Sequence, residues 1–584
     1  MTPQTNASGA STTEVILLRP RQGINESRSS YPLGLVQLRS AFSASFPISI
    51  FDADGLSREG KSFARIKKEL IGRAETKASV LIVGITTNDA NLPEALHLAR
   101  LLKKTRRDCH VVFGGPGVYF DSQKLIDSFP DLIDVIVRGE GSLVFPGVVA
   151  SIVAGDRELL TKKIVSAPKV ENMDSLPFPR YDLLRAQQSL ADDPEDAWLP
   201  IFAGAGCAHT CKYCSTSNFW GHRVGYKSRD RLIREIEALG KLGHRNVEFI
   251  HDNLFSDMSV VVGLAERLIE DEIDVRWGCS GRIDDFDLSA LPTLMRSGCR
   301  KIFWGMESGS AQALEIMGKK IDLVESKKKL FRILSEKDLH STVSFVYNHP
   351  GDSCRMFEET LGLAVEIKSR FPYNSTLSLN NYLNLSGTAF GRGVFARSPF
   401  LIGKIDFDQE LVEKNPERFP FFSTSKDVTG LSTEFRFQKL NYIIDSYPKT
   451  IHCLAAALGL GLVSRALDRA TDVRSGLQSL IAKLAPGSIG RDLLAFEAAS
   501  HVGAVRRRGK PRLLATRIDV NCYPDVREEK RCYYLFSASA GAVDTYEITE
   551  EYHRQFKNFS RHKQYDKHIV SEILRGLEAT EDRE

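Results

Sequence analysis

The first 155 residues alternate short apolar runs with longer amphipathic segments. The apolar runs are rich in valine and isoleucine, as buried strands are, and they lie at 15–20, 48–52, 80–86, 110–114 and 134–137. Segments of helix length lie between them at 34–45, 59–75, 90–105 and 122–129, and another follows from 143. This alternation predicts an α/β domain over residues 15–155, with a parallel, doubly wound sheet covered by helices on both faces.

A second alternation begins at residue 199. Strands are predicted at 199–206, 246–252, 274–282, 301–309, 340–350 and 375–385, and helices at 228–242, 257–270, 287–297, 322–337 and 353–369. Six β/α repeats are too few to close an eight-stranded barrel. We therefore expect an open, partial (β/α)6 barrel over residues 196–395, with its chemistry at the carboxyl ends of the strands.

The remaining segments are less regular. Residues 1–14 are polar and predict a disordered tail that does not resemble a secretory signal, and the proline-containing stretch 156–195 reads as a linker. Residues 396–584 predict a mixed, mainly helical C-terminal domain, which we expect to recognise the substrate. Its expected helices lie at 435–446, 450–467, 471–484 and 564–577, and strands are expected in "LATRIDV" and "RCYYLFSA".

Composition limits the classes of protein that fit. With 42% hydrophobic and 26% charged residues, the 584-residue chain is typical of a globular protein and not of a fibrous or disordered one. A net charge of +4 does not indicate nucleic acid, and the basic run at 505–512 is more typical of a solvated link. The apolar segment 453–463 is too short to cross a bilayer. Ten cysteines without the spacing of a disulfide framework favour the reducing cytoplasm. From the small net charge and the short apolar segment, we expect neither a membrane nor a nucleic-acid partner.

Three of those cysteines lie close together, as Cys207, Cys211 and Cys214 in "CAHTCKYC". Such a loop could hold an incomplete zinc site, three free thiols or an iron–sulfur cluster. A structural zinc site needs four ligands, and His209 as the fourth lies inside the same loop, where tetrahedral closure would be strained. A cluster used only for electron transfer also takes four cysteines. Three thiolates on a [4Fe–4S] cluster leave one iron open for catalysis, and we favour this interpretation.

The C-x3-C-x2-C spacing, placed just after a predicted strand and with Tyr213 before the last cysteine, resembles the radical S-adenosylmethionine (SAM) superfamily. The resemblance implies that the three cysteines bind a [4Fe–4S] cluster, that SAM chelates the open iron, and that reductive cleavage of SAM yields a 5′-deoxyadenosyl radical. The segment "WGMESGS" (304–310) is similar to the family's G-x-E-S-G motif. The SAM-binding residues that the resemblance implies are Tyr213, Ser280, Arg282, Glu307 and Ser308.

Two segments depart from the family pattern. "FIHDNLF" (249–255) resembles F-x-D-D-N-F, with His251 where an aspartate is usual. "VYNHPGDS" (346–353) resembles G-x-P-G-E-T, with Asn348 in place of the first glycine, which implies an altered backbone approach to adenine. For Arg282 and Glu307, ion pairs at the surface or in the barrel interior are the alternative to contacts with SAM.

The first domain lacks both G-x-G-x-x-G after its first strand and G-x4-G-K-[ST], which argues against nicotinamide and ATP. Instead, the order of "YPLGLVQLRSAF" (31–42), "FDADG" (51–55), "VGITTND" (83–89), "FGGPGVYF" (113–120) and "VIVRGEGS" (135–142) resembles the cobalamin-binding domain of class B radical SAM enzymes. The cobalamin-binding residues implied are Leu33, Gly34, Thr86, Thr87, Gly114, Gly115, Pro116, Gly139 and Glu140.

This domain has "DADGLS" where other corrinoid domains carry D-x-H-x-x-G, so the resemblance implies a cobalt without a histidine ligand. A domain that retains the fold without the cofactor is the alternative. The family scheme uses one SAM to methylate cobalamin. A second SAM, cleaved at the cluster, generates the radical that activates the substrate carbon.

The resemblance therefore implies a cobalamin-dependent C-methyltransferase that acts on an unactivated carbon of a small natural product or peptide. It also implies an electron donor such as flavodoxin or ferredoxin. A cyclisation or rearrangement without methylation is the alternative reaction, and a non-catalytic corrinoid or redox sensor is the alternative class. A methylthiotransferase would want a second cysteine triad near the N-terminus, but residues 1–200 contain only Cys109.

Overall fold

The structure is a computed structural model. It describes residues 12–21, 31–42, 47–183, 197–371, 374–393, 395–398, 401–402, 405 and 408–426, together with three strands between 517 and 548. The chain forms two compact units. The first contains residues 1–360 and 371–434, and the second contains residues 361–370 and 435–584. None of the described helices is both long and apolar enough to span a membrane.

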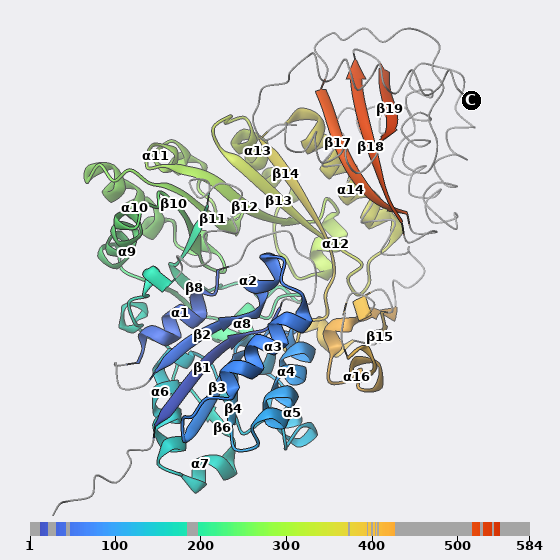
Figure 1. The fold of residues 1–584 in the computed structure, drawn as a ribbon. Coiled ribbons are helices and arrows are strands. Elements are labelled where there is room, and N and C mark those ends of the chain that lie inside the picture. Colours follow the sequence, from blue (N-terminus) through green and yellow to red (C-terminus); the bar gives the residue numbers. More distant parts are fainter. Residues whose placement is uncertain are drawn as a thin grey trace, which may run out of the picture. The chain divides into compact units, whose positions relative to one another are not determined.

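The first unit begins with a six-stranded parallel sheet in the order β2-β1-β3-β4-β5-β6 (Figure 1). Its strands are β1 (Thr13–Arg19), β2 (Ile48–Asp52), β3 (Val80–Thr86), β4 (His110–Gly114), β5 (Val135–Arg138) and β6 (Ile164–Ser166). Its helices are α1 (Leu33–Ser40), α2 (Ala53–Arg58), α3 (Phe63–Ala74), α4 (Leu92–Thr105), α5 (Ser122–Ser128), α6 (Gly141–Val153) and α7 (Arg157–Lys162).

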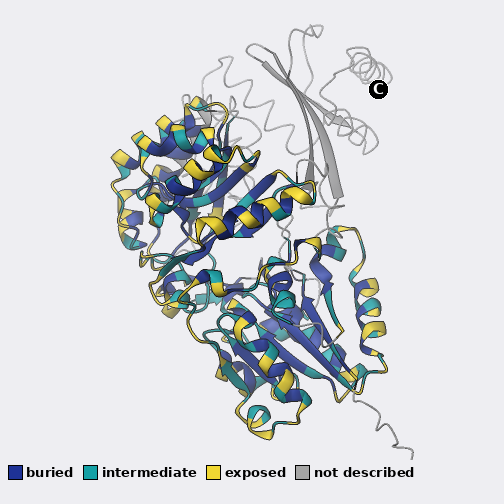
Figure 2. Cartoon of the chain, turned by 90° about the vertical axis from the view of Figure 1, so that its left-hand side faces the viewer, coloured by how far each residue is buried: buried dark blue, intermediate teal, exposed yellow. Residues whose placement is uncertain are grey.

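Successive side chains of a buried strand point to opposite faces of the sheet, and both faces of this one are covered. Val15 and Leu17 of β1 pack with α1 and α6, whereas Ile16 and Leu18 pack with α3, α4 and α5. Figure 2 shows the result as buried strands between helices whose outer sides are exposed. The predicted doubly wound sheet is therefore confirmed.

The first domain extends beyond the predicted boundary at 155. Helix α7 and strand β6 lie in the stretch that the sequence assigned to a linker, and β6 pairs with β5 in parallel. Strand β6 has only three residues, so no apolar periodicity marks it. Residues 174–177 of the predicted linker are held by Arg231, which donates to the carbonyls of Asp174, Leu176 and Pro177.

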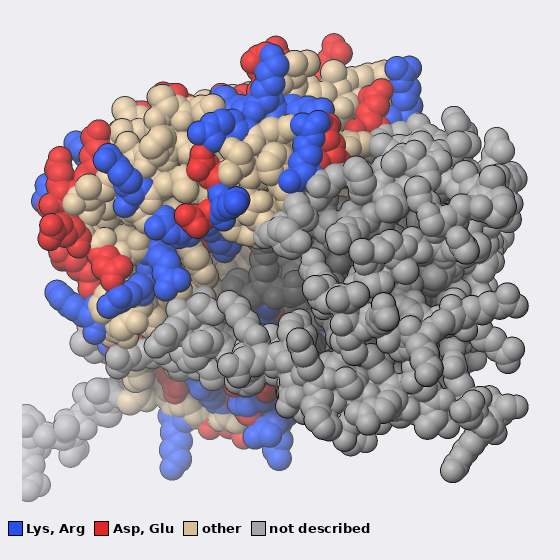
Figure 3. Space-filling view, turned by 90° about the horizontal axis from the view of Figure 1, so that it is seen from above, with Lys and Arg blue, Asp and Glu red and all other residues tan. Residues whose placement is uncertain are grey.

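A second six-stranded parallel sheet, in the order β14-β13-β12-β11-β10-β7, confirms the open partial barrel. Its strands are β7 (Leu199–Phe202), β10 (Asn246–Ile250), β11 (Arg276–Arg282), β12 (Cys299–Glu307), β13 (His340–Tyr347) and β14 (Ser375–Asn381). Its helices are α8 (Thr216–Trp220), α9 (Arg229–Lys241), α10 (Met258–Glu270), α11 (Leu291–Arg296), α12 (Ala311–Ile316), α13 (Leu323–Leu334) and α14 (Cys354–Arg370). Basic and acidic side chains are interspersed over the described part of the face shown in Figure 3.

The predicted strand at 199–206 is in fact two strands. After β7 the chain turns into β8 (Gly204–Gly206), which pairs antiparallel with β9 (Val224–Tyr226). Gly206 has φ of +95°, and a Cβ there would lie 1.8 Å from the carbonyl oxygen of Arg223. The hairpin therefore needs glycine at this position, and it brackets the cysteine loop and α8.

A buried ion cluster joins the linker to the barrel. Glu235 of α9 is fully buried, and its Oε1 accepts hydrogen bonds from Lys227 Nζ at 2.7 Å and Arg231 Nε at 2.6 Å. Its Oε2 accepts one from the hydroxyl of Tyr181 at 2.7 Å. Two cations thus share one carboxylate away from water. Removal of any one of the three charged groups would leave a buried charge uncompensated and destabilise the fold.

The boundary predicted at 395 also differs from the structure. The segment 395–426 contains β15 (Phe395–Arg397), α16 (Gln409–Lys414) and β16 (Ser423–Ser425), and it belongs to the first unit. Its apolar side chains, among them Leu401, Val412 and Phe421, join the core formed by α3, α4 and α5 of the first domain. The chain after the barrel therefore packs against the N-terminal sheet's own helices.

Within the second unit the structure describes an antiparallel sheet of β17 (Arg517–Asp525), β18 (Lys530–Ser539) and β19 (Ala542–Ile548). Both strands predicted in this region correspond to β17 and β18, and β19 was not predicted. The four predicted helices between 435 and 577 lie outside the described residues.

Candidate active site

The cysteine loop connects β8 to α8 and is tied to three separate parts of the barrel. Asp252, just after β10, accepts a hydrogen bond from Gly206 N at 2.7 Å and another from Thr216 Oγ1 at 3.0 Å, one on each side of the cysteines. Lys212, between the second and third cysteines, donates its backbone N–H to Met317 and accepts one from Phe390. These hydrogen bonds hold the loop in place, and none of them involves a thiol.

The three thiols of this loop are free and partly exposed. Burial raises the pKa of Cys207 and of Cys214, so both are protonated without a metal, and binding of iron would release their protons. Within the described residues, the one group of potential ligands whose atoms all lie within 4.8 Å of one another is His209, Asp284 and Asp285, and the cysteines form no such group.

This spread of the thiols bears on the kind of metal site. Thiolates on a single zinc lie about 3.8 Å apart, because each Zn–S bond is about 2.3 Å long. At least one pair of the three thiols lies farther apart than 4.8 Å, a separation that suits the corners of a cluster. The three cysteines therefore fit a [4Fe–4S] cluster better than one zinc ion, although their role as its ligands stays a prediction.

His209 does not complete a zinc site, because its ring is engaged elsewhere. Its Nε2 lies 2.8 and 3.1 Å from the two carboxylate oxygens of Asp285. Asp285 also accepts a hydrogen bond from Asn253 Nδ2 at 2.6 Å, and Asn253 Oδ1 accepts one from the backbone of Arg282 at 3.0 Å. This network joins the cysteine loop to the ends of β10 and β11.

Arg282 lies beside the thiols. Its Nη1 is 3.2 Å from Cys211 Sγ, and its Nη2 donates to Asp284 at 2.7 Å. Burial acts to lower the pKa of Arg282, but the hydrogen bond that it donates to Asp284 and the nearby negative charges outweigh burial, and the pKa is raised. The side chain is buried, and its Nε has no hydrogen-bond partner. Both alternatives considered for Arg282 thus remain compatible with its position: it forms an ion pair, and it adjoins the predicted cluster.

Glu307 ends β12 in a conformation that non-glycine residues rarely adopt, with φ of +68°. Its Oε1 is 3.1 Å from the buried ammonium of Lys319, which also donates to the carbonyl of Gly305 at 2.7 Å. Burial raises the pKa of Tyr213 well above its usual value, and the Glu307 charge raises it further. Glu307, Tyr213 and Arg282 therefore surround the same thiols, and strain of this kind is typical of functional sites.

The other two predicted SAM-binding residues differ in accessibility. Ser280 lies two residues before Arg282 on the same face of β11 and is partly exposed. Ser308 is buried, and its hydroxyl is engaged by Thr360 Oγ1 at 2.5 Å and by the backbone N–H of Ser310 at 3.0 Å. The Ser308 hydroxyl thus supports the turn after β12. Contacts of either residue with SAM stay predictions.

The two departures from the family pattern have structural explanations. His251 accepts a hydrogen bond from Asn253 N on Nδ1 and contacts the Gly225 carbonyl through Nε2. Burial lowers its pKa to about 4, so it is neutral and stacks on Tyr226. Asn348 has φ of +60°, in the left-handed region that a glycine would also adopt. Whether Asn348 alters the approach of the backbone to adenine stays a prediction.

Most of the predicted cobalamin-binding residues lie along the carboxyl edge of the first sheet. Thr86 ends β3, Gly114 ends β4, and Gly139 follows β5, so three adjacent strands present them at one edge. Thr87 is buried, and its hydroxyl donates to the Gly114 carbonyl at 2.8 Å. Leu33 and Gly34 begin α1, Gly115 and Pro116 follow β4, and Glu140 is the N-cap of α6. This edge is where doubly wound sheets bind ligands.

The glycines at this edge differ in why they must be small. A Cβ on Gly115, which has φ of +92°, would lie 2.4 Å from the Thr87 carbonyl oxygen, whereas a Cβ on Gly34 would meet nothing within 4 Å. We expect Gly115→Ala to lower the free energy of unfolding by about 1–3 kcal/mol through backbone strain and this clash. Gly34→Ala should stabilise α1 by up to about 1 kcal/mol.

If cobalamin approaches the backbone at Gly34, the same Gly34→Ala variant should bind cobalamin more weakly. Denaturant unfolding and a cobalamin titration of both variants separate the two effects. An unchanged affinity in Gly34→Ala removes Gly34 from the predicted site.

Contacts within the first unit bring the carboxyl edges of its two sheets together. The rings of Tyr119, after β4, and Phe219, in α8, have centroids 4.4 Å apart. Asn218 Nδ2 donates to the Gly387 carbonyl at 2.6 Å, and a Cβ on Gly387 would lie 2.4 Å from the ring of Phe120. Asp89 accepts a hydrogen bond from Ser386 N at 3.4 Å, and burial raises its pKa. The helix after the cysteine loop thus adjoins the edge predicted to bind cobalamin.

Several residues of this site were missed from the sequence. Asp252 and Asn253 lie inside "FIHDNLF", so the family likeness of that segment could have identified them. Asp285 and Lys319 belong to no motif. Asp285 contacts His209, which is 76 residues away in the chain, and Lys319 contacts Glu307, which is 12 residues away.

Asp252 offers a test of the loop's external support. We expect Asp252→Ala to retain its fold but to lose iron to a chelator about tenfold faster than the wild type, since residues that orient metal ligands typically contribute 10–100-fold in metal affinity. Glu266→Ala, at an exposed position of α10, is the matched control. Equal rates of iron loss in the two variants would show that Asp252 does not support the site.

Comparison with known proteins extends this picture. The Radical SAM superfamily matches residues 201–364, and the B12 binding domain matches residues 28–149. An uncharacterized methyltransferase of Pyrococcus horikoshii is 29% identical over 355 residues, which cover 58% of this chain and 73% of that protein. The anaerobic magnesium-protoporphyrin IX monomethyl ester cyclase of Rubrivivax gelatinosus is 26% identical over 48% of this chain and 54% of the cyclase.

A solved structure has a similar fold. The radical S-adenosylmethionine methyltransferase TsrM from Kitasatospora setae, with cobalamin and a [4Fe–4S] cluster bound, aligns with a TM-score of 0.52. The alignment covers 65% of this chain and 77% of TsrM at 17% sequence identity. At that identity the likeness concerns the fold alone.

Proposed function

Because the chain belongs to the cobalamin-binding (class B) radical SAM enzymes, we propose that it methylates an unactivated carbon of a small natural product or peptide. As a member of this family it uses a [4Fe–4S] cluster, SAM and cobalamin. The likeness to a methyltransferase of Pyrococcus horikoshii supports methyl transfer. The substrate and the carbon attacked are part of the proposal.

The observation that carries the proposal is the junction between the two carboxyl edges. Tyr119 of the first domain contacts Phe219, five residues after Cys214, so the predicted cobalamin edge and the cysteine loop adjoin the same helix. A methyl group held at one edge and a radical formed at the other could then reach one substrate. Fixing reactants in this way is the protein's main contribution to a reaction that needs no side-chain acid or base.

The bound cofactors supply a 5′-deoxyadenosyl radical and a transferable methyl group. The residues of the chain position these groups and keep the site selective. In the proposal, Cys207, Cys211 and Cys214 hold the cluster, Asp252 and Asn253 fix the loop, and Arg282 places a permanent positive charge beside Cys211. Glu307, held by Lys319, is the acceptor that we assign to a hydroxyl or ammonium group of SAM.

Anaerobic reconstitution with iron, sulfide and cobalamin tests the proposal, with SAM labelled in its methyl group, a reductant and candidate substrates. Methylation consumes two SAM molecules and two electrons per product, one electron to cleave SAM and one to return cobalamin to its reduced state, and it yields S-adenosylhomocysteine, 5′-deoxyadenosine and methionine. We expect the first two in equal amounts, with label in the product. Reduced flavodoxin or ferredoxin should replace the chemical reductant, as proposed for the natural donor.

The likeness to a cyclase of Rubrivivax gelatinosus favours one alternative, a cyclisation without methyl transfer. In that case the same assay gives 5′-deoxyadenosine without S-adenosylhomocysteine and without label in the product. That result would exclude methylation and support the alternative.

A further inference from the structure

Exposed cations from three separate segments lie around the cysteine loop. Lys212 belongs to the loop itself, Lys320 lies between α12 and α13, and Arg392 lies in the segment after β14; all three residues are exposed. The backbone of Lys212 joins the three segments, because its N–H donates to the carbonyl of Met317 at 2.8 Å and its carbonyl accepts from Phe390 N at 3.0 Å. We call this surface the cation face and define it by Lys212, Lys320 and Arg392.

Carboxylates do not neutralise the cation face. None of its three cations forms an ion pair within the part of the chain that the structure describes. Of the acidic residues within five positions of them, Glu325 pairs with Lys328 at 2.7 Å, Asp322 caps α13, and Glu315 is exposed without a described partner. Charges that no neighbour neutralises extend their field into the solvent, so this face attracts negatively charged molecules.

The cation face begins beside two of the predicted cluster ligands. Lys212 is bonded directly to Cys211, and one residue separates it from Cys214, so its Cα lies about 3.8 Å from that of Cys211. Both cysteines are partly exposed. Gly318, which has φ of +68°, packs under Lys212, where a Cβ would lie 3.4 Å from that side chain. A molecule bound on this face therefore comes close to the predicted cluster.

The form of this surface suits a protein rather than a small anion. Small anions are held by convergent groups, such as the paired donors of a buried arginine, whereas these three cations are exposed and come from separate segments. Proteins that exchange electrons form small, transient interfaces, and complementary charge sets how fast they meet. An acidic protein that approaches the cysteine loop to deliver electrons has the charge and the position that this face requires.

We propose that the cation face docks the electron donor, an acidic one-electron carrier protein of the flavodoxin or ferredoxin kind. The docked carrier gives one electron to the predicted cluster and leaves oxidised by one electron. Lys212, Lys320 and Arg392 steer the carrier to the loop and contact neither SAM nor the substrate. The inference rests on the proposed function, because only a chain that holds a cluster needs this donor, and it is independent of whether the reaction is methylation.

The test measures electron transfer from reduced flavodoxin to the reconstituted full chain by stopped-flow absorbance of the flavin. The double variant Lys320→Glu/Arg392→Glu reverses two charges of the face and leaves the cysteine loop unchanged. We expect its second-order rate constant at low salt to be about 10- to 100-fold below that of the wild type, because steering accelerates association by this order. Raising the salt from about 50 to 400 mM should slow the wild type and remove most of the difference. Lys241→Glu, at an exposed position at the end of α9, is the matched control and should react as the wild type does.

Photoreduction by deazaflavin, a small uncharged reductant that needs no docking, separates docking from damage to the cluster. The double variant should be photoreduced as fast as the wild type. Slower photoreduction, an unchanged rate with flavodoxin, or an equal loss in Lys241→Glu would overturn this inference alone. Each single variant should show part of the loss, which keeps the test valid if the double variant fails to fold. A wild-type chain that shows no cluster absorbance before any donor is added would overturn the proposed function as well.

Discussion

Replacing Cys211 by alanine is expected to abolish the [4Fe–4S] cluster and to lower cleavage of SAM by more than about 100-fold. Changes to residues that merely orient metal ligands typically cost 10–100-fold in metal affinity or activity, and a lost ligand should cost more. Arg282 Nη1 lies 3.2 Å from Cys211 Sγ, so loss of Cys211 also removes this contact between the guanidinium and the site.

The fold should survive this change, because the loop is tied down by Asp252 and by the backbone of Lys212 independently of the thiols. The measurements are iron and sulfide content, visible absorbance and the yield of 5′-deoxyadenosine, with cobalamin binding as the check on the first domain. Cys211→Ala should bind cobalamin as the wild type does.

Cys109→Ala is the matched control for the loss of a thiol. Cys109 is buried in the core of the first domain, burial raises its pKa to about 11, and it lies far along the chain from the cysteine loop. Its replacement should cost about 1 kcal/mol of stability through a small cavity and leave the iron content unchanged. A full iron complement in Cys211→Ala would refute the proposed ligand set.

The second large effect is expected from Glu235→Ala, which should lower the free energy of unfolding by about 3–5 kcal/mol. The substitution leaves the ammonium of Lys227 and the guanidinium of Arg231 buried together without their shared carboxylate. It also removes the acceptor of the Tyr181 hydroxyl and so loosens the linker that Arg231 holds.

Urea unfolding followed by tryptophan fluorescence measures this effect in the relevant part of the chain, because all four tryptophans lie between residues 198 and 304. Glu237→Ala, at an exposed position of the same helix, should change stability by less than about 0.5 kcal/mol. Coincident unfolding curves for the two variants would show that the cluster contributes no stability as an ion network.

At Gly206 and Asn348 the residue type alone indicates the backbone conformation. Both adopt positive φ values, and glycine and asparagine are residues that tolerate them. The sequence therefore contained the signal for both backbone conformations. It contained none for Glu307, which has φ of +68° and pairs with the buried ammonium of Lys319.

The sequence by itself determined both parallel sheets, their order along the chain and the cysteine loop. Each of these follows from residues a few positions apart: alternating apolar runs specify buried strands, and a C-x3-C-x2-C spacing can be read within one loop. The chemistry suggested by that spacing and by the glycine-containing strand ends agrees with the Radical SAM and B12 binding families, which match residues 201–364 and 28–149.

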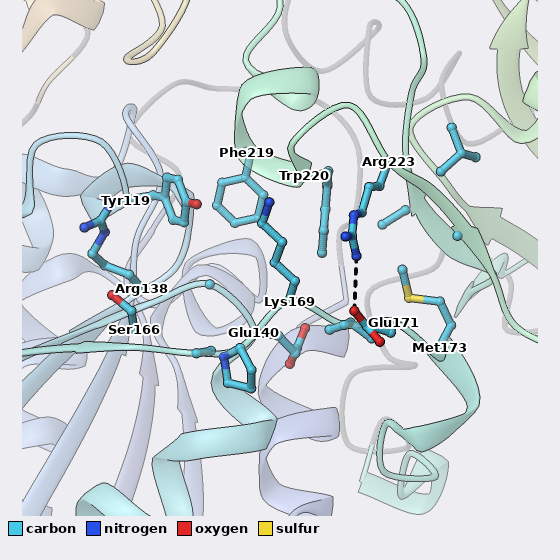
Figure 4. A pocket seen from close by; sticks show the side chains of 17 residues that line it. Tyr119, Arg138, Glu140, Ser166, Lys169, Glu171, Met173, Phe219, Trp220 and Arg223 are labelled. Atoms are coloured by element: carbon cyan, nitrogen blue, oxygen red, sulfur yellow. Dashed lines mark ion pairs between the residues drawn. The ribbon is translucent and has the colours of Figure 1, made fainter.

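Only the tertiary structure decided what holds these parts together. The three-residue strand β6, the return of residues 401–422 to the helices of the first domain, and the partners Asp252, Asp285 and Lys319 all depend on contacts between distant segments. The same is true of the cavity lined by Arg138, Lys169, Phe219 and Arg223, whose walls come from both domains (Figure 4). Pairings of this kind are selected by the packing of the whole chain, so no local pattern of polar and apolar residues records them.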